Sequence, residues 1–295
     1  NGSSVPFKFF FGAPSCVPAT PFETAGDSLG VQEIEALMKK DEVKYLAEMM
    51  NWPGVLSRDE LVMAKIGVAH RYGKVIDGHA PGLTGEQAFQ YASAGISTDH
   101  ECFTREEALS KLGCGMKILI REGSAARNFE ALITLLHDHP DHMMFCSDDK
   151  HPDSLEAGHI NQLVIRALSK GIGLFKVLKA ACFNPVVHYK LDVGLLRTGD
   201  PADFIVVDNL RDFKVLKTFI NGDCVAEGGK TRIAPVQKEI INRFHQRTLK
   251  PEDFQLPASG TKLRVIEAME GQLVTGEGIA ECKAVNGFAV SDPSR

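Results

Sequence analysis

The chain has 295 residues, of which 44% are hydrophobic and 24% are charged, and its formal net charge is −5 at pH 7. This length allows one large domain, or a large and a small one, with a substantial core. Lys and Arg form no basic stripe, which argues against nucleic acid or a membrane surface as a partner, and no apolar run approaches the ~20 residues that span a bilayer. We therefore expect a small-molecule partner.

Cysteine usage indicates the compartment. The seven cysteines include no C-x-x-C pair, and no signal-peptide pattern opens the chain. In a chain of this length such cysteines are typical of reduced thiols rather than of a disulfide framework. We expect a cytoplasmic protein.

Short apolar or β-rich runs alternate with segments of helical periodicity, which favours a parallel α/β architecture. Strands are predicted over residues 7–13, 43–49, 74–80, 95–101, 116–122 and 143–149. Helices are predicted over residues 30–40, 58–72, 84–93, 104–112, 127–138, 154–170 and 173–183. One βα unit per strand fits part of a (β/α)8 TIM barrel, in which the chemistry lies at the carboxyl ends of the strands.

The composition changes near residue 191, where Gly and Asp turns surround the runs FIVVD and VLKTFING. This pattern is typical of a small antiparallel β unit. We expect a partial TIM-barrel catalytic domain over 1–190, a small β-sandwich portion over 191–230, and the start of a C-terminal α+β region over 231–295. That last region is predicted to contain a helix around 235–246, a linker near 251–257, and strands at 262–267 and 282–290.

Polar residues close successive predicted strands, where a barrel places its chemistry. They are Glu48, His79, His100, Arg121 with Glu122, and Asp148 with Asp149. Imidazole nitrogens and carboxylate oxygens bind Zn²⁺, Mn²⁺ or Fe²⁺, and one carboxylate can bridge two ions. A lone strand-end histidine is more often an ordinary hydrogen-bonded residue, and one acid of the Asp pair could cap the next helix. Ligand types at equivalent positions on several strands nevertheless predict a metal site.

Several stretches resemble the adenine deaminase family of the amidohydrolase superfamily. They are GAPSCVPATPFETAG, LAEMMNWPGV, IDGHAPGLTG, STDHECFT, IREGSAARN, FCSDDKHP and GDPADFIVVD, and the similarity extends over nearly the whole chain. The resemblance implies that Glu48 bridges two metal ions. It also implies that His79, His100 and Asp148 complete the ligand set from barrel strands five, six and eight.

One departure from the family pattern concerns the His-x-His of the first barrel strand, because residues 1–47 contain no histidine. By resemblance, the first predicted strand corresponds to the third of the barrel, so the barrel would be represented by strands three to eight. Six strands cannot close an eight-stranded barrel without exposing edges. We therefore expect a piece of a longer enzyme, lacking the N-terminal His-x-His segment and the C-terminal end, and we expect the piece alone to be inactive.

The resemblance implies hydrolytic deamination of adenine to hypoxanthine and ammonia in purine salvage, by a metal-activated hydroxide. The expected cofactor is a binuclear Mn²⁺ or Fe²⁺ centre, with Zn²⁺ as an alternative, and the expected assembly is a homo-oligomer. Asp148 would act as ligand and base, and Glu101 would protonate a ring nitrogen. Arg121, Glu122, Ser124 and Asp149 are candidates for lining the purine pocket, although capping and salt bridging explain them equally well.

Two other functions remain open at this point. The first is another amidohydrolase acting on a cyclic amide or nucleobase, such as an allantoinase or dihydroorotase relative, although those usually carry a lysine where Glu48 stands. The second is an inactive fragment whose metal site cannot assemble. The zinc deaminases with H-x-E and P-C-x-x-C motifs are set aside, because neither motif occurs.

Overall fold

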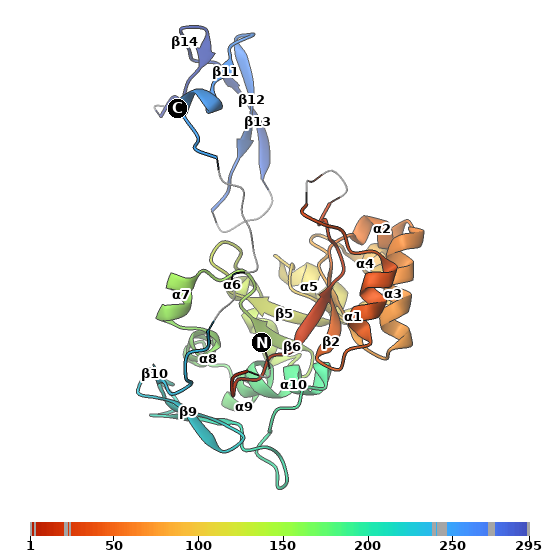
Figure 1. The fold of residues 1–295 in the computed structure, drawn as a ribbon, viewed down its shortest axis with the longest axis vertical. Coiled ribbons are helices and arrows are strands. Elements are labelled where there is room, and N and C mark those ends of the chain that lie inside the picture. The colour runs from red at the N-terminus through yellow and green to blue at the C-terminus, as the bar shows by residue number, and fades with distance from the viewer. Residues whose placement is uncertain are drawn as a thin grey trace. The chain divides into compact units, whose positions relative to one another are not determined.

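The computed structural model describes residues 2, 4–20, 23, 25–237, 240, 247–270 and 275–293. Their contacts divide the chain into two compact units, Asn1–Ala234 and Pro235–Arg295. Figure 1 shows the parallel strands and most of the helices in the first unit. All residues of the predicted metal site belong to that unit.

Six parallel strands form the centre of the first unit. They are β1 (Phe11–Pro14), β2 (Val43–Met49), β3 (Val75–Gly78), β4 (Thr98–Asp99), β5 (Lys117–Arg121) and β6 (Met143–Cys146). They pair in parallel in the orders β1-β2-β3 and β4-β5-β6. A parallel bridge between Ile76 and Ile96 links the two sheets. The carboxyl ends of all six strands therefore face the same way, as a barrel requires.

Helices connect and follow these strands. They are α1 (Val31–Met38), α2 (Trp52–Leu56), α3 (Glu60–Arg71), α4 (Gly85–Ser93), α5 (Arg105–Gly113), α6 (Phe129–Leu132), α7 (Pro152–Ala157), α8 (Ile160–Ser169), α9 (Leu174–Leu178) and α10 (Asn184–Tyr189), with the 3-10 helix η1 (Ile133–His137) and the π-helical turn η2 (Lys179–Phe183). Side-chain caps begin some of these helices, including α3 and α5. The Asp59 carboxylate accepts hydrogen bonds from the amides of Leu61 and Val62, and the Thr104 hydroxyl accepts one from Glu107.

The core of the first unit consists of two hydrophobic clusters. One surrounds β1–β3 and includes Leu46 and Ile76, with α1 and α3 packed together against β2 (Figure 1). The other surrounds β4–β6 and includes Ile118 and Phe145. Each cluster packs around one of the two sheets. Close packing in both clusters therefore holds the strand ends, and the side chains they carry, in place.

Beyond α10, the described strands are antiparallel. In the first unit β7 (Phe204–Val207), β8 (Val215–Ile220), β9 (Asp223–Glu227) and β10 (Lys230–Thr231) form a sheet in the order β10-β9-β8-β7. The second unit contains the 3-10 helix η3 (Pro251–Phe254) and the strands β11 (Leu256–Pro257), β12 (Lys262–Glu267), β13 (Gly276–Glu281), β14 (Ala284–Val285) and β15 (Phe288–Ala289). Most of the helix predicted around 235–246 lies outside the described residues.

The α/β architecture with parallel sheets is confirmed. Strands β2 and β12 have the predicted limits, whereas β1 begins at Phe11 instead of residue 7. The helix predicted over 127–138 is shorter and ends as the 3-10 helix η1, and the short helix α2 was not predicted, because its sequence WPGVL contains both Pro and Gly. The three-part division with boundaries at 190 and 230 stays a prediction.

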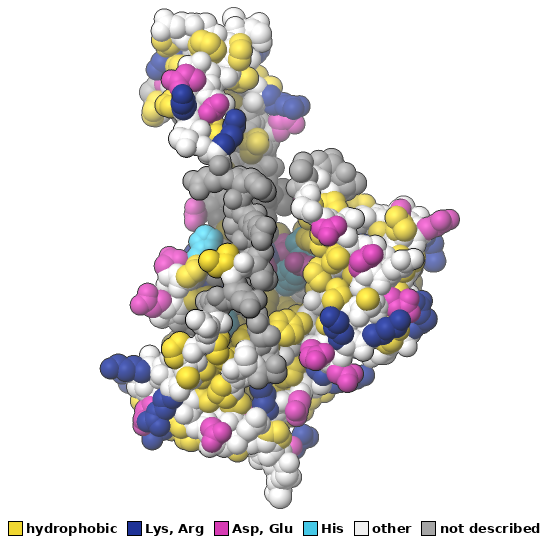
Figure 2. Space-filling view, viewed as in Figure 1, with side chains coloured by type: hydrophobic (Ala, Val, Ile, Leu, Met, Phe, Trp, Pro, Cys, Tyr) yellow, Lys and Arg dark blue, Asp and Glu magenta, His cyan; other side chains and the backbone are white. Residues whose placement is uncertain are grey.

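The distribution of surface charge and the state of the cysteines agree with what the composition predicts. Figure 2 shows basic and acidic side chains interspersed over the face in view. All seven cysteines are free thiols. Among the described residues, no helix combines the length and the apolar character needed to cross a membrane.

Candidate metal centre

The carboxyl ends of the parallel strands bring together residues that are far apart in sequence. Glu48 is the penultimate residue of β2, His79 directly follows β3, and His100 directly follows β4. Glu48 Oε2 lies 3.0 Å from His79 Nδ1 and 3.2 Å from His100 Nε2. The two imidazole rings are 5.3 Å apart and inclined at 73°. One ligand atom from each of the three residues fits within 4.8 Å of the others, the spacing of groups that surround one ion.

Glu101 lies as near to the two imidazoles as Glu48 does. Its Oε1 is 3.4 Å from His79 Nδ1 and 3.2 Å from His100 Nε2, and the residue is 1% exposed. His100, Glu101 and Asp148 form a second group with ligand atoms within 4.8 Å. Sequence reasoning gave Glu101 a role in proton transfer and missed this proximity to both histidines.

Arg121, the last residue of β5, links the two acids of this second group. Its fully buried guanidinium donates to Asp148 Oδ2 at 2.6 Å, to Glu101 Oε2 at 3.1 Å, and also to Glu101 Oε1. Behind it, the Asn128 amide accepts a hydrogen bond from the Arg121 backbone N–H at 2.7 Å and donates to the carbonyl of His100 at 3.0 Å. Arg121 thus holds the carboxylates that follow β4 and β6 in a fixed relation.

The electrostatics of the site reflect this crowding of acids and bases. The neighbouring imidazole of His100 and the hydrogen bond with His79 hold the pKa of Glu48 well below its usual range, against the opposing effect of burial. Burial alone would lower the pKa of His100, but the carboxylates of Glu101 and Glu48, each 3.2 Å from Nε2, outweigh that effect and raise the pKa to about 10. Burial would raise the pKa of Glu101, yet His100, His79 and Arg121 lower it. Without a metal, the carboxylates therefore keep a proton on the imidazole.

The residues present fit a divalent metal. His100 Nε2 is buried and has no hydrogen-bond partner of acceptable geometry among the described residues, although two carboxylate oxygens lie 3.2 Å away. A buried imidazole nitrogen directed at carboxylate oxygens that it does not hydrogen-bond is in the position of a metal ligand. The donor set of imidazole nitrogen and carboxylate oxygen suits Mn²⁺, Fe²⁺ or Zn²⁺.

Two backbone features shape the site. Asp148 has φ of 47°, in the left-handed region that Asp and Asn tolerate better than most residues. Gly78, next to His79, lies so close to β4 that a Cβ at this position would collide with the carbonyl oxygen of Thr98. The absence of a side chain at Gly78 therefore permits the short separation of β3 and β4 at the end where their histidines meet.

A cavity of about 400 Å³ opens beside these candidate ligands. Glu48, His100 and Asp148 line it together with Tyr45 and Asp77. Burial raises the pKa of the Asp77 carboxyl to about 6, although it accepts hydrogen bonds from the hydroxyls of Thr98 and Tyr189. The volume is within the range of small-molecule sites.

The structure places the predicted purine-contacting residues around the end of β5. Arg121 is fully buried against the two acids, and the carboxylate of Glu122 pairs with Arg166 at 2.8 Å. The Ser124 hydroxyl accepts a hydrogen bond from the His151 backbone N–H at 2.9 Å, and Asp149 is exposed. Their contact with a purine stays a prediction.

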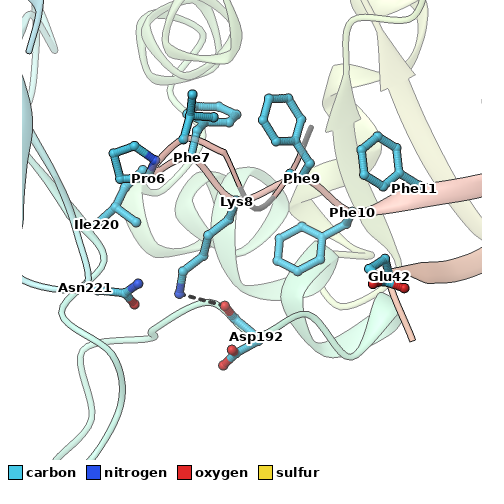
Figure 3. A pocket seen from close by; sticks show the side chains of 12 residues that line it. Pro6, Phe7, Lys8, Phe9, Phe10, Phe11, Glu42, Asp192, Ile220 and Asn221 are labelled. Atoms are coloured by element: carbon cyan, nitrogen blue, oxygen red, sulfur yellow. Dashed lines mark hydrogen bonds between the residues drawn. The ribbon is translucent and has the colours of Figure 1, made fainter. Parts of the chain in front are cut away.

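A second hollow, of about 500 Å³, lies along the N-terminal segment before β1. Figure 3 shows Phe9 and Phe11 on one side of this extended segment and Lys8 and Phe10 on the other. The Lys8 ammonium donates to the carbonyl of Asp192 at 2.8 Å. Phe9 and Phe11 are each 45% exposed. The metal-ligand groups found among the described residues do not include any residue of this hollow.

The chain belongs to the amidohydrolase family, which it matches over residues 2–225. The matched region contains every residue of the candidate metal centre. Membership of this family implies a divalent metal, in agreement with the donor set at the strand ends.

Curated relatives support a narrower resemblance. The chain is 55% identical over 295 residues to a protein from Salinibacter ruber named adenine deaminase, covering 100% of this chain and 54% of that protein. It is 51% identical to a Methanosarcina mazei protein of the same name, covering 98% of this chain and 55% of the relative. The predicted resemblance to adenine deaminases is thus confirmed, and the chain spans about half the length of the curated relatives it matches.

Solved structures show the same fold at low sequence identity. A β-aspartyl dipeptidase from Fervidobacterium islandicum AW-1 superposes with a TM-score of 0.53 and 19% identity, covering 79% of this chain and 66% of that one. An N-isopropylammelide isopropylaminohydrolase from Burkholderia multivorans gives a TM-score of 0.51 and 14% identity, covering 72% of this chain and 62% of that one. At these identities the likeness supports the fold alone.

Proposed function

We propose that the intact protein containing this chain hydrolyses adenine to hypoxanthine and ammonia, with a divalent metal held by Glu48, His79, His100 and Asp148. One combined observation carries the proposal. Glu48, His79 and His100 meet within 4.8 Å at strand ends, in a chain 55% identical to a protein named adenine deaminase. The carboxylate at residue 48 also favours this reaction over that of cyclic amidases, which usually carry a lysine there.

We further propose that β1 to β6 correspond to strands three to eight of an eight-stranded barrel. The parallel pairing of β1-β2-β3 and β4-β5-β6, and the bridge between Ile76 and Ile96, support a continuous arc of strands. In this arrangement Glu48, His79, His100 and Asp148 belong to barrel strands four, five, six and eight. Strands that precede β1 in the intact protein would supply the remaining metal ligands.

The chemistry that a bound divalent metal supplies is a lowered pKa for a coordinated water, from 15.7 to roughly 7. The chain's own residues then orient and move protons. Asp148, whose carboxylate is fixed by Arg121 at 2.6 Å, is placed to accept a proton from the attacking water and to deliver it to the departing amine. Glu101, fixed by the same guanidinium, is placed to exchange a proton with a ring nitrogen.

The proton balance of the reaction fits two acids. Water adds to C6 of adenine through its oxygen, and the bond from C6 to the amino nitrogen breaks. One of the two water protons reaches N1 of the ring and the other reaches the amino group, which leaves as ammonia. Because the pKa of Glu101 is lowered by His100, His79 and Arg121 against the effect of burial, Glu101 starts as a carboxylate. Glu101 therefore accepts a proton that comes from the attacking water and then donates it to N1 of the ring.

Ammonia release by the intact protein tests the proposal. Adenine and adenosine are each supplied to protein loaded with Mn²⁺ or Fe²⁺, and ammonia is measured in a coupled assay. We expect turnover of adenine and none of adenosine. The variant His100→Ala should lose the activity, while His137→Ala, at an exposed histidine on η1, should keep it. Absence of adenine turnover in metal-loaded protein, or equal turnover of base and nucleoside, would overturn the proposal.

A further inference from the structure

A second cluster of charged residues lies behind the candidate metal centre, and sequence reasoning did not single it out. It consists of Asp99 at the end of β4, and Glu107 and Lys111 on α5. The side chain of Lys111 is completely buried, as is that of Asp99, and that of Glu107 is 6% exposed. A lysine is almost never fully buried unless its charge is paired.

The Lys111 ammonium uses all three of its N–H donors. It donates to Asp99 Oδ2 at 2.7 Å, to Glu107 Oε1 at 2.8 Å, and to the carbonyl of Ala80 at 2.6 Å. With Cys102, whose thiol donates to Asp99 Oδ2 at 3.2 Å, the two carboxylates form a group of the kind that holds a metal ion. Here the ammonium already occupies the position of the cation.

Each partner of Lys111 is attached to a segment that carries a candidate ligand. Ala80 directly follows His79, and its N–H donates to Asp99 Oδ1 at 2.9 Å. Asp99 directly precedes His100 in the chain. The Lys111 ammonium and the Asp99 carboxylate therefore join the segment after β3 to the segment after β4 by hydrogen bonds that involve no metal.

Glu107 extends the connection on both sides. Its Oε1 accepts a hydrogen bond from the Gly82 N–H at 2.7 Å, three residues after His79. Its Oε2 accepts one from the Phe103 N–H at 3.2 Å, three residues after His100. The same carboxylate thus restrains both ligand-bearing segments at their far ends.

We propose that Lys111 is a positioning residue for the metal centre, an internal cation that fixes the relative placement of His79 and His100. The proposal rests on the metal-binding role proposed for these two histidines. If Lys111 is replaced by a neutral side chain, the carboxylates of Asp99 and Glu107 repel each other in a buried setting. The segments after β3 and β4 then separate, and the imidazoles lose the spacing that suits one ion.

The test measures Mn²⁺ affinity in the intact protein, by calorimetric titration of metal-free protein with Mn²⁺ alone. Loss of a residue that orients metal ligands typically costs 10–100-fold in metal affinity, and we expect Lys111→Met to weaken Mn²⁺ binding by about that factor. The matched control is Lys74→Met. Lys74 also donates to backbone carbonyls, of Met38 at 2.6 Å and Lys40 at 2.7 Å, but these bonds lie before the first residues of β2 and β3, at the opposite strand ends from Glu48 and His79. The control should bind Mn²⁺ with unchanged affinity even where its melting temperature falls.

A milder variant keeps the test decisive if Lys111→Met does not fold. Glu107→Gln retains an oxygen that can accept from Lys111 or Gly82 but removes one charge, and we expect it to fold and to bind Mn²⁺ more weakly than unmodified protein. Lys111→Arg, which restores the positive charge, should recover part of the affinity. Unchanged Mn²⁺ affinity in folded Lys111→Met or Glu107→Gln, or an equal loss in Lys74→Met, would overturn the inference.

The outcomes also separate this inference from the proposed reaction. If unmodified protein binds Mn²⁺ without releasing ammonia from adenine, while Lys111→Met binds more weakly, the positioning role stands and the proposed reaction falls. If unmodified protein deaminates adenine and Lys111→Met keeps full Mn²⁺ affinity, the reaction stands and the positioning role falls. Unmodified protein that binds none of Mn²⁺, Fe²⁺ and Zn²⁺ contradicts both.

Discussion

Two charged clusters meet at the carboxyl end of β4, and their difference shows how a protein distinguishes a metal site from a structural ion pair. The metal-facing cluster contains Glu48, His79, His100, Glu101 and Asp148, and the nitrogen Nε2 of His100 has no hydrogen-bond partner among the described residues. The Lys111 cluster contains a similar pair of acids, but every ammonium proton has an acceptor. In our proposal the first cluster takes up an ion from outside, whereas the second carries its cation within the chain.

The two clusters also differ in how far their charged side chains are exposed to solvent. Glu48 is 39% exposed at its side chain, next to a cavity that a small molecule can enter. The side chains of Lys111 and Asp99 are completely buried. A catalytic site must be accessible to its substrate. In an ion pair, by contrast, the attraction between the charges becomes stronger where water is excluded. The predictions that follow test this division.

The largest effect is expected in the metal-facing cluster. Asp148→Asn removes a base and a ligand while keeping a residue type that tolerates the left-handed backbone, so the substitution isolates the carboxylate. We expect kcat for adenine to fall by about 10²–10⁴-fold, the usual contribution of a positioned acid or base. Steady-state ammonia release by the metal-loaded intact protein measures it. Asp153→Asn, at an exposed position in the first turn of α7, is the control, and a kcat for Asp148→Asn equal to that of the control would remove Asp148 from the mechanism.

Besides its expected effect on Mn²⁺ affinity, the Lys111 cluster should respond in the stability of the metal-free protein. Removing one partner of a buried ion pair leaves an uncompensated charge and typically costs about 3–5 kcal/mol. We expect Lys111→Met to lower the free energy of unfolding of metal-free protein by about that amount, measured by urea denaturation. A loss below about 1 kcal/mol, the range of exposed pairs, would show that the cluster is not a structural ion pair.

Proton linkage should distinguish the clusters in the metal-free protein. The pKa of His100 is raised from 6.5 to about 10, because the neighbouring carboxylates of Glu101 and Glu48 outweigh the effect of burial. A raised pKa gives stability that is fully present below about pH 6.5 and is lost as the pH rises toward about 10. We expect the free energy of unfolding to fall over this interval, and His100→Asn to remove most of the slope.

Urea denaturation at a series of pH values measures this slope, with His137→Asn as the control. Because a metal competes with the proton for the imidazole, added Mn²⁺ should raise the melting temperature more at the upper end of the interval than at the lower end. The same slope in His100→Asn and in unmodified protein would show that His100 does not titrate in this way.

The smallest effect is expected at an exposed pair with nearly the same geometry as the Lys111 pair. Lys170 Nζ lies 2.6 Å from Glu130 Oε2, but the two side chains are 41% and 64% exposed. Such pairs contribute about 0–1 kcal/mol, so Lys170→Met should change the free energy of unfolding by no more than that. The difference between Lys170→Met and Lys111→Met in the same urea experiment isolates burial as the cause. Equal losses would mean that distance, and not burial, decides the contribution of these pairs.

The strands, and the polar residues at their carboxyl ends, could be predicted from local sequence patterns. The limits of β2 follow from its apolar run, and His79 and His100 stand directly after β3 and β4, where a parallel α/β fold places functional groups. The predicted strands at 74–80 and 95–101 were too long, because they included the ligand-bearing residues that leave the sheet.

Tertiary contacts explain what the sequence could not reveal. Lys111 lies on a helix whose other charges suit a solvated face, and nothing in its neighbours indicates complete burial against Asp99. For Arg121 the sequence left a substrate contact and a salt bridge equally open, and only the folded structure identifies Glu101 and Asp148 as the carboxylates that its guanidinium contacts. Both interactions join residues from different strands and loops, so they depend on the folded arrangement and leave no local signal.

Gly78 has a consequence for how such a protein can change over time. Its missing side chain leaves the space that Thr98 occupies at the neighbouring strand, directly beside His79. Alanine, the smallest change available, would force β3 and β4 apart and carry one histidine away from the other. Natural selection on this site would therefore act on a residue that offers no ligand, no proton and no hydrogen-bonding side chain. A position without any chemistry of its own would tolerate as little variation as the ligands do.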